Sequence, residues 1–210
     1  MGKCIIFCAA GFGSLAVPIE KDDFVIAADG GLQHTEKLGI IPNEILGDFD
    51  SLGYVPADSR VFPVEKDDTD AMLAVRRGLA LGYREFLLYG GLDGPRLDHT
   101  VANLQLLQYL ADHGAFGLLA GLTHMVAVIK NGVLRFPGSP TGIFSLFCMG
   151  PDARGVTIRG AQYELENGTL TAGFPLGVSN HFLGRETEIS VTDGSLLVIW
   201  ERTDGFPQPL

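Results

Sequence analysis

Short apolar runs alternate with helical periodicity through the first half of the chain. Residues 3–9 are apolar almost throughout, which is typical of a central parallel strand buried on both faces. Further strands are expected at 24–28, 44–46, 60–64, 85–89 and 116–120. Helices are expected at about 32–38, from the acidic segment 65–70 to about residue 80, and at about 97–114. This alternation predicts an α/β domain over residues 1–123 with a mostly parallel, Rossmann-like sheet.

The second half of the chain has a different pattern, without a good helical stretch. Apolar runs recur at 125–129, 133–136, 144–149, 155–158, 188–191 and 195–200, and the turn signals between them are Asn131-Gly132, Pro137-Gly138, Asn167-Gly168 and Asp193-Gly194. This pattern predicts an all-β sandwich domain over residues 124–210. Asn131-Gly132 is the strongest hairpin signal, because its residue types suit a tight turn and apolar runs flank it.

Composition narrows the possible function classes. The chain has 210 residues and a formal charge of −10, with no basic stripe, so we do not expect nucleic-acid binding. No apolar stretch approaches the roughly 18 residues of a membrane span. Cys4, Cys8 and Cys148 are odd in number and lack metal-site spacing, which indicates reduced thiols in a cytoplasmic protein.

Four acidic clusters follow successive apolar runs. They are Asp29-Gly30-Gly31, Gly47-Asp48-Phe49-Asp50-Ser51, Lys66-Asp67-Asp68-Thr69-Asp70 and the segment from Gly90 to Thr100. Because parallel strands end at the same edge of a sheet, these carboxylates are expected to converge. Such an edge suits a divalent metal ion and a phosphate-bearing substrate.

Each cluster taken alone also has an ordinary explanation. The D-x-D-S segment could form an Asx turn, and Asp67, Asp68 or Thr69 could cap the helix that follows. Asp98 could be a first-turn acid of its helix. Arg96 is better placed for function, since it lies between a glycine loop and a helix start, where a guanidinium can meet phosphate oxygens.

A G-x-G-x-x-A pattern at Gly11, Gly13 and Ala16 matches part of a dinucleotide-binding fingerprint, with Asp29 at the end of the next strand. Only residues 14–23 separate this loop from that strand, and Pro18 interrupts them. That is too little chain for a crossover helix, so dinucleotide binding is disfavoured. A glycine loop whose amides approach a phosphate stays open.

The ordered set of motifs resembles the thiamine pyrophosphokinase family. The motifs are A-D-G-G, G-D-F-D-S, E-K-D-D-T-D and G-x-R-L-D-H-T-x-A-N-L in the first half, and Gly177-Val178-Ser179-Asn180 with its neighbours in the second. The resemblance implies transfer of a diphosphate from ATP to the hydroxyl of thiamine, giving thiamine diphosphate and AMP. It also implies a homodimer with each site completed across the interface.

The resemblance assigns roles residue by residue. It places Mg²⁺ on Asp48, Asp50 and Asp70; ATP on Asp29, Lys66, Thr69 and Arg96; thiamine on Ser179 and Asn180; and catalysis on Asp48, Asp70, Asp98 and Arg96. Asp98 is the acid that we expect to take the hydroxyl proton, with solvent as the alternative. Asp93 and Pro95 stand where glycine is more usual, which predicts a stiffer loop. Residues 1–123 would be the catalytic domain and 124–210 the thiamine-binding domain.

Two other functions stay open at this level. The acids of the first half do not define the acceptor, so another alcohol, such as a pterin alcohol, could replace thiamine. A non-catalytic module that senses a nucleotide or thiamine is the alternative from a different class.

Overall fold

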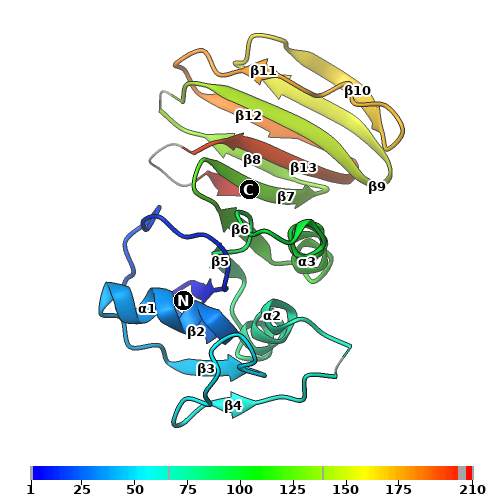
Figure 1. Cartoon of the computed structure of the whole chain (residues 1–210). Coiled ribbons are helices and arrows are strands. Elements are labelled where there is room, and N and C mark those ends of the chain that lie inside the picture. Colours follow the sequence, from blue (N-terminus) through cyan, green and yellow to red (C-terminus); the bar gives the residue numbers. More distant parts are fainter. Residues whose placement is uncertain (1, 66, 139, 203–206, 210) are drawn as a thin grey trace. The chain divides into compact units, whose positions relative to one another are not determined.

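The computed structural model describes residues 2–65, 67–138, 140–202 and 207–209 (Figure 1). The chain forms two compact units, Met1–Leu106 with Gly117–Leu122, and Leu107–Phe116 with Thr123–Leu210. Among the described residues, no helix has the length and apolar character needed to cross a membrane.

The first unit contains a sheet with strand order β6-β5-β1-β2-β3-β4. The strands are β1 (Cys4–Phe7), β2 (Phe24–Ala28), β3 (Glu44–Gly47), β4 (Arg60–Val61), β5 (Glu85–Tyr89) and β6 (Phe116–Ala120). The pairs β1–β2, β1–β5, β2–β3 and β3–β4 are all parallel, as the continuous apolar runs indicate. Because β1 has neighbours on both sides, its side chains are fully buried, which explains why its run lacks polar positions.

The first unit contains three α-helices and one 3₁₀ turn among its described residues. They are the 3₁₀ turn η1 (Asp29–Gly31), α1 (Leu32–Leu38), α2 (Asp70–Ala80) and α3 (Leu97–Asp112), whose last residues belong to the second unit. Thr69 caps α2, since its side chain accepts a hydrogen bond from the Met72 amide at 3.2 Å. Residues 8–23 contain no helix between β1 and β2, as expected from the short connection.

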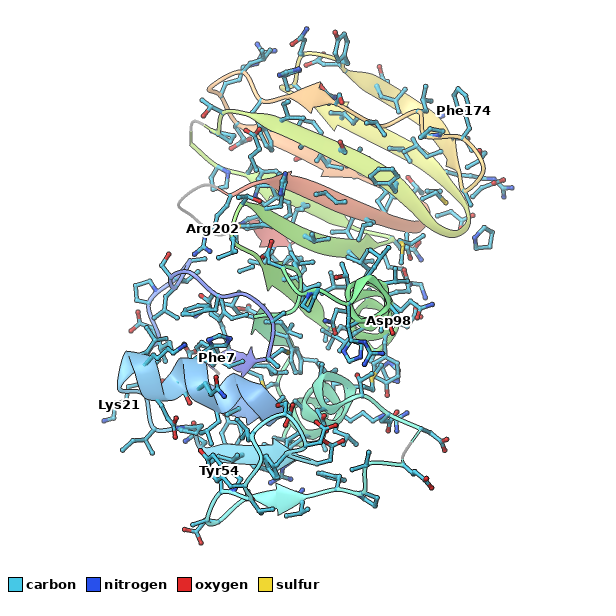
Figure 2. The ribbon with its side chains drawn as sticks, viewed as in Figure 1. Phe7, Lys21, Tyr54, Asp98, Phe174 and Arg202 are labelled. Atoms are coloured by element: carbon cyan, nitrogen blue, oxygen red, sulfur yellow. The ribbon has the colours of Figure 1, made fainter. Side chains whose placement is uncertain are left out.

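An aromatic cluster secures the loop that follows β1. The rings of Phe7 (labelled in Figure 2) and Tyr89 stack at 5.2 Å, and Phe12 packs against both of them. The buried Tyr89 hydroxyl accepts hydrogen bonds from the backbone amides of Ala16 at 2.9 Å and Val17 at 3.4 Å. The loop is therefore attached to the end of β5 rather than to a crossover helix.

The second unit is antiparallel, with strand order β14-β8-β12-β9-β13-β7 and with β10 and β11 also paired to β9. The strands are β7 (His124–Lys130), β8 (Val133–Phe136), β9 (Ile143–Arg159), β10 (Leu165–Thr171), β11 (Asn180–His181), β12 (Thr187–Ser190), β13 (Asp193–Glu201) and β14 (Gln208–Pro209). Residues 144–149 and 155–158, predicted as separate strands, are parts of β9. Its first part pairs with β13, and its second part pairs with β10 and β12.

The turn signal at Asn167-Gly168 lies inside a strand. Asn167 has a φ of 51°, and the register of β10 against β9 shifts on both sides of Gly168. The residues therefore form an irregularity of the bulge type within β10 instead of ending it. The sequence predicted a turn between strands here, but the pairing of β10 with β9 keeps these residues within one strand.

The predicted hairpin at Asn131-Gly132 is wrong. β7 pairs with β13, whereas β8 pairs with β12 and β14, so the two strands flanking the turn have different partners. The turn itself is present: Asn131 has a φ of 48°, and its side chain accepts a hydrogen bond from the Gly194 amide at 2.8 Å. Asn-Gly specifies a local reversal, but contacts distant in sequence determine which strands pair.

Ring contacts in the second unit join strands that are not neighbours in the sheet. Phe136 on β8 meets Trp200 on β13 with centroids 5.2 Å apart, and Phe182 lies 4.9 Å from Phe136 and 4.6 Å from Phe144. All four side chains are buried. These rings form much of the apolar core of this unit.

We predict that Gly78→Ala destabilises the protein, although alanine is the better helix former. A Cβ at this position would lie 2.5 Å from the Phe86 ring and 2.7 Å from Cys4 Sγ, and both neighbours are fully buried. The overpacking cost of about 1–3 kcal/mol should exceed the gain in helix propensity of about 1 kcal/mol. Urea unfolding measures the net change, and a raised midpoint would contradict the packing described for α2.

Candidate functional site

A cavity of about 590 Å³ lies in the first unit at the carboxyl ends of its parallel strands. Residues that follow β1 (Cys8, Ala9 and Ala10) and β5 (Gly90 and Gly91) form its floor. In the sheet, β5 and then β6 lie on one side of β1, whereas β2, β3 and β4 lie on its other side. The strand order therefore reverses at β1. A crevice forms at such a point because the connections leave on opposite sides, and ligands of open α/β sheets bind there.

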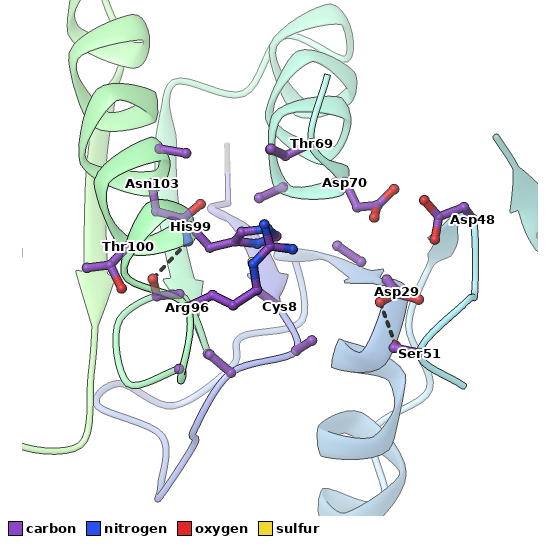
Figure 3. A pocket seen from close by; sticks show the side chains of 18 of the residues that line it. Cys8, Asp29, Asp48, Ser51, Thr69, Asp70, Arg96, His99, Thr100 and Asn103 are labelled. Carbon is purple, nitrogen blue, oxygen red and sulfur yellow. Dashed lines mark hydrogen bonds between the residues drawn. The ribbon is translucent and has the colours of Figure 1, made fainter. Parts of the chain in front are cut away.

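One wall of the cavity is acidic. Asp29 follows β2, Asp48 and Asp50 follow β3, and Asp70 begins α2. One carboxylate oxygen from each of Asp29, Asp48 and Asp50 lies within 4.8 Å of the others. Figure 3 shows the Asp70 carboxylate pointing toward that of Asp48. The structure therefore groups Asp29 with the two D-x-D acids, and Asp70 faces them. The resemblance gave the metal to Asp48, Asp50 and Asp70, with Asp29 and Asp98 close to the same centre.

Asp29 is the most constrained of these acids. Its residue is 9% exposed, and its φ of 47° is uncommon for a residue with a side chain. Its Oδ2 accepts a hydrogen bond of 2.6 Å from Ser51 Oγ, and its Oδ1 is buried without a hydrogen-bond partner among the described residues. A buried carboxylate oxygen without a partner is costly, and a bound cation would satisfy it.

Gly47 allows the two strand ends to approach each other. It has a φ of 151°, and a Cβ at this position would lie 3.1 Å from the N, Cα and Cβ atoms of Asp29. Only glycine fits without displacing that backbone. The first residue of the G-D-F-D-S motif is thus specified by the neighbouring strand.

The opposite wall carries Arg96, His99 and the loop that follows β5. Two side chains of α3 hold this loop: Thr100 Oγ1 donates to Leu92 O at 3.1 Å, and Asn103 Nδ2 donates to Gly91 O at 2.8 Å. The threonine and asparagine of the L-D-H-T-x-A-N motif therefore position the loop. The motif is recognisable in the sequence, but no role was predicted for Thr100 or Asn103.

Arg96 reaches the cavity, but Asp98 is not among the residues that line it. Both side chains are largely exposed and form an ion pair, with Arg96 Nη2 2.5 Å from Asp98 Oδ2. The hydrogen bond from Arg96 lowers the pKa of Asp98, which makes it a weaker base. Its predicted role as a proton acceptor gains no support from this geometry.

The remaining predicted residues have varied positions. Thr69 lines the cavity while it caps α2, and Lys66 lies outside the described residues. Ser179 is exposed in the second unit, with a φ of 63°. Asn180 is buried in that unit, where its side chain donates to Tyr163 O at 2.7 Å and accepts from the Tyr163 amide at 3.0 Å.

The donor set of the acidic wall fits a hard divalent cation. Carboxylate oxygens are the protein ligands of Mg²⁺, which usually keeps several waters and phosphate oxygens in its coordination sphere. Arg96 and the N-terminus of α2 add positive charge and dipole for an anion. The cavity can thus hold a metal-bound polyphosphate.

Two family models match the chain in succession. "Thiamin pyrophosphokinase, catalytic domain" matches residues 16–115, and "Thiamin pyrophosphokinase, vitamin B1 binding domain" matches residues 133–196. A thiamine pyrophosphokinase of Bacillus subtilis is 28% identical over 191 residues, which cover 83% of this chain and 85% of the relative.

Solved structures share the fold. A thiamine pyrophosphokinase structure from Bacillus subtilis has a TM-score of 0.82 at 24% identity and covers 97% of this chain and 100% of its own. One from Candida albicans has a TM-score of 0.74 at 14% identity, with 96% of this chain and 89% of its own covered.

We predict that Gly47→Ala weakens cation binding. The added Cβ would push against Asp29 at 3.1 Å and would be strained at a φ of 151°, so we expect the three carboxylates to shift and the Kd for Mn²⁺, a spectroscopic stand-in for Mg²⁺, to rise about tenfold or more. Gly39→Ala is the matched control, because Gly39 has a φ of 66° and no atom within 4 Å of its Cβ position. An unchanged Kd in Gly47→Ala, measured by electron paramagnetic resonance, would contradict the account.

We also predict that Cys8 resists alkylation in the folded protein. Burial, followed by the negative charge of Asp70, raises the pKa of the Cys8 thiol to about 12. The reactive thiolate is therefore scarce at pH 8. Iodoacetamide labelling followed by peptide mass spectrometry should leave Cys8 unmodified until urea unfolds the chain. Rapid labelling of folded protein at pH 8 would show that the cavity floor is not packed as described.

Proposed function

The chain belongs to the thiamin pyrophosphokinase family, and we propose on that basis that it transfers a diphosphate group from ATP to the hydroxyl of thiamine. The products are thiamine diphosphate and AMP. The observation that carries this function is the succession of the catalytic and vitamin B1 binding models along one chain. The acidic cavity in the region matched by the catalytic model supports it independently.

We propose Mg²⁺ as the cofactor, with Asp29, Asp48 and Asp50 as the residues that would hold it and Asp70 facing them. Their clustering and the buried Oδ1 of Asp29 support this assignment. When bound, the ion would supply charge neutralisation at the phosphate oxygens. This assignment adds Asp29 as a ligand to the set that the resemblance implies, which is Asp48, Asp50 and Asp70.

The chain's own contribution to catalysis is positioning and charge. Arg96 and Thr69 lie where they can contact phosphate oxygens of ATP, and the N-terminus of α2 favours an anion there. Lys66 has the same proposed role on sequence grounds. Diphosphate transfer needs in-line alignment more than covalent help, so no nucleophilic side chain is required.

We assign the hydroxyl proton of thiamine to solvent rather than to Asp98. The lowered pKa of Asp98 and its pairing with Arg96 favour this choice. The arrangement also leaves Arg96 able to exchange a carboxylate partner for a phosphate one, since both groups present a pair of oxygens that can accept two hydrogen bonds from its guanidinium.

The second unit is proposed as the thiamine-binding domain, with residues 124–210 forming a β-sandwich after a Rossmann-like domain over 1–123. β8 and β13 are not paired with each other, yet the rings of Phe136 on β8 and Trp200 on β13 are in contact. This contact supports two facing layers. Ser179 and Asn180 keep their proposed place near thiamine, with Asn180 acting through the backbone that it holds.

We further propose a cytoplasmic homodimer whose sites are completed across its interface, as the resemblance implies. Exposed apolar side chains on the second unit, among them Phe174 (labelled in Figure 2), Leu176 and Val178, support an interface there. The three cysteines are unpaired, which suits a reducing compartment.

Incubation of the purified protein with thiamine, ATP and Mg²⁺ tests the function. We expect AMP and thiamine diphosphate in equal amounts by ³¹P NMR and chromatography. Asp48→Asn should lower kcat on the order of 100-fold, because transition-state charge loses its compensation. Asp58→Asn is the control, since Asp58 is exposed and does not line the cavity.

Other outcomes of this assay distinguish the alternatives. Release of ADP would contradict diphosphate transfer. Faster turnover with a pterin alcohol than with thiamine would change the acceptor. Ligand binding without turnover would indicate a sensing module.

A further inference from the structure

Ser51 lies on the turn that follows β3, beside the acidic wall of the cavity. We propose that Ser51 is a positioning residue for the cation: its hydroxyl holds the Asp29 carboxylate so that the second oxygen faces Asp48 and Asp50. The inference rests on the proposed Mg²⁺ site. Ser51 itself is not proposed as a ligand.

The hydrogen bond between Ser51 and Asp29 has a defined direction. The distance from Ser51 Oγ to Asp29 Oδ2 is 2.6 Å (dashed in Figure 3). An ionised carboxylate can only accept, so the hydroxyl donates its proton to Oδ2. Oδ1 is then the oxygen left for a cation, and it is the atom that is buried without a partner among the described residues.

Backbone geometry fixes Ser51 at this place. The turn is closed by hydrogen bonds from the Leu52 and Gly53 amides to Phe49 O, each of 3.3 Å, and Phe49 is buried with a φ of 60°. Gly30 leaves the room that the hydroxyl needs, because a Cβ there would lie 3.1 Å from Ser51 Oγ.

The spacing of the D-x-D-S segment follows from this arrangement. Asp48 and Asp50 bring their own carboxylates to the cluster, and Ser51 fixes the acid of the neighbouring strand. One short turn thus supplies two ligands and orients a third. Groups that hydrogen-bond to metal ligands orient them and tune the affinity for the ion.

Loss of the hydroxyl should weaken cation binding without abolishing it. Removing such a supporting group typically costs about 10–100-fold in metal affinity. Ser51 is exposed, so water can partly replace the hydroxyl, and we expect about a tenfold rise in the Kd for Mn²⁺, at the lower end of that range.

The test is a titration of the whole protein with Mn²⁺, without nucleotide, followed by electron paramagnetic resonance. Ser51→Ala should bind about tenfold more weakly than the wild type. Ser59→Ala should bind normally, because the Ser59 hydroxyl donates to Pro56 O at 2.7 Å and does not line the cavity. Urea midpoints within error of each other establish that both variants are folded.

A double-mutant comparison separates positioning from a general structural effect. If Ser51 acts through Asp29, Ser51→Ala should add little to the loss already caused by Asp29→Asn. If Ser51→Ala lowers Mn²⁺ affinity by the same factor in the wild-type protein and in the Asp29→Asn variant, the proposal is overturned. Wild-type affinity in Ser51→Ala, with weakened binding in Asp29→Asn, would overturn it while leaving the metal site intact. Unchanged affinity in both Asp29→Asn and Asp48→Asn would overturn the metal site and this proposal together.

Discussion

The close approach of two strand ends, at Gly47 and Asp29, is the constraint on which the site depends. A Cβ at position 47 would lie 3.1 Å from the backbone of Asp29, so a side chain there would force that backbone to shift. The approach brings Asp29, Asp48 and Asp50 together, and carboxylates this close repel one another unless a cation lies between them. Asp29 also has a positive φ, and its Oδ1 is buried. Packing of the sheet therefore sets the spacing of the three carboxylates.

The parallel sheet sets the rest of the geometry. The loops that follow its strands lie at one edge of the sheet, beside the N-terminus of α2 and the glycine loop before α3. The first unit thus presents an acidic wall and a wall with Arg96 across one cavity. A metal-bound polyphosphate carries both a cation and phosphate anions. The acidic wall suits the cation, and Arg96 suits the phosphates.

Local signals and distant contacts contributed differently to what the sequence could predict. The strand at 24–28 and the helix at 32–38 were predicted to the residue, because apolar runs and a glycine stop are local properties. Convergence of the acids was also predictable, since parallel strands end at one edge. The partners of β7 and β8 were not, because Asn131-Gly132 specifies a turn but not a pairing. The roles of Ser51 and Asp98 were likewise not predictable, because they depend on contacts with Asp29 and Arg96 that form only in the folded chain.

The proposed metal site can be located in an anomalous-difference map from crystals grown with Mn²⁺ and a non-hydrolysable ATP analogue. If Asp29, Asp48 and Asp50 hold the ion, the map should contain one strong peak within coordinating distance, about 2.2 Å, of their carboxylate oxygens. A map with no peak at this edge of the sheet, or with the ion bound only elsewhere on the chain, would contradict this assignment.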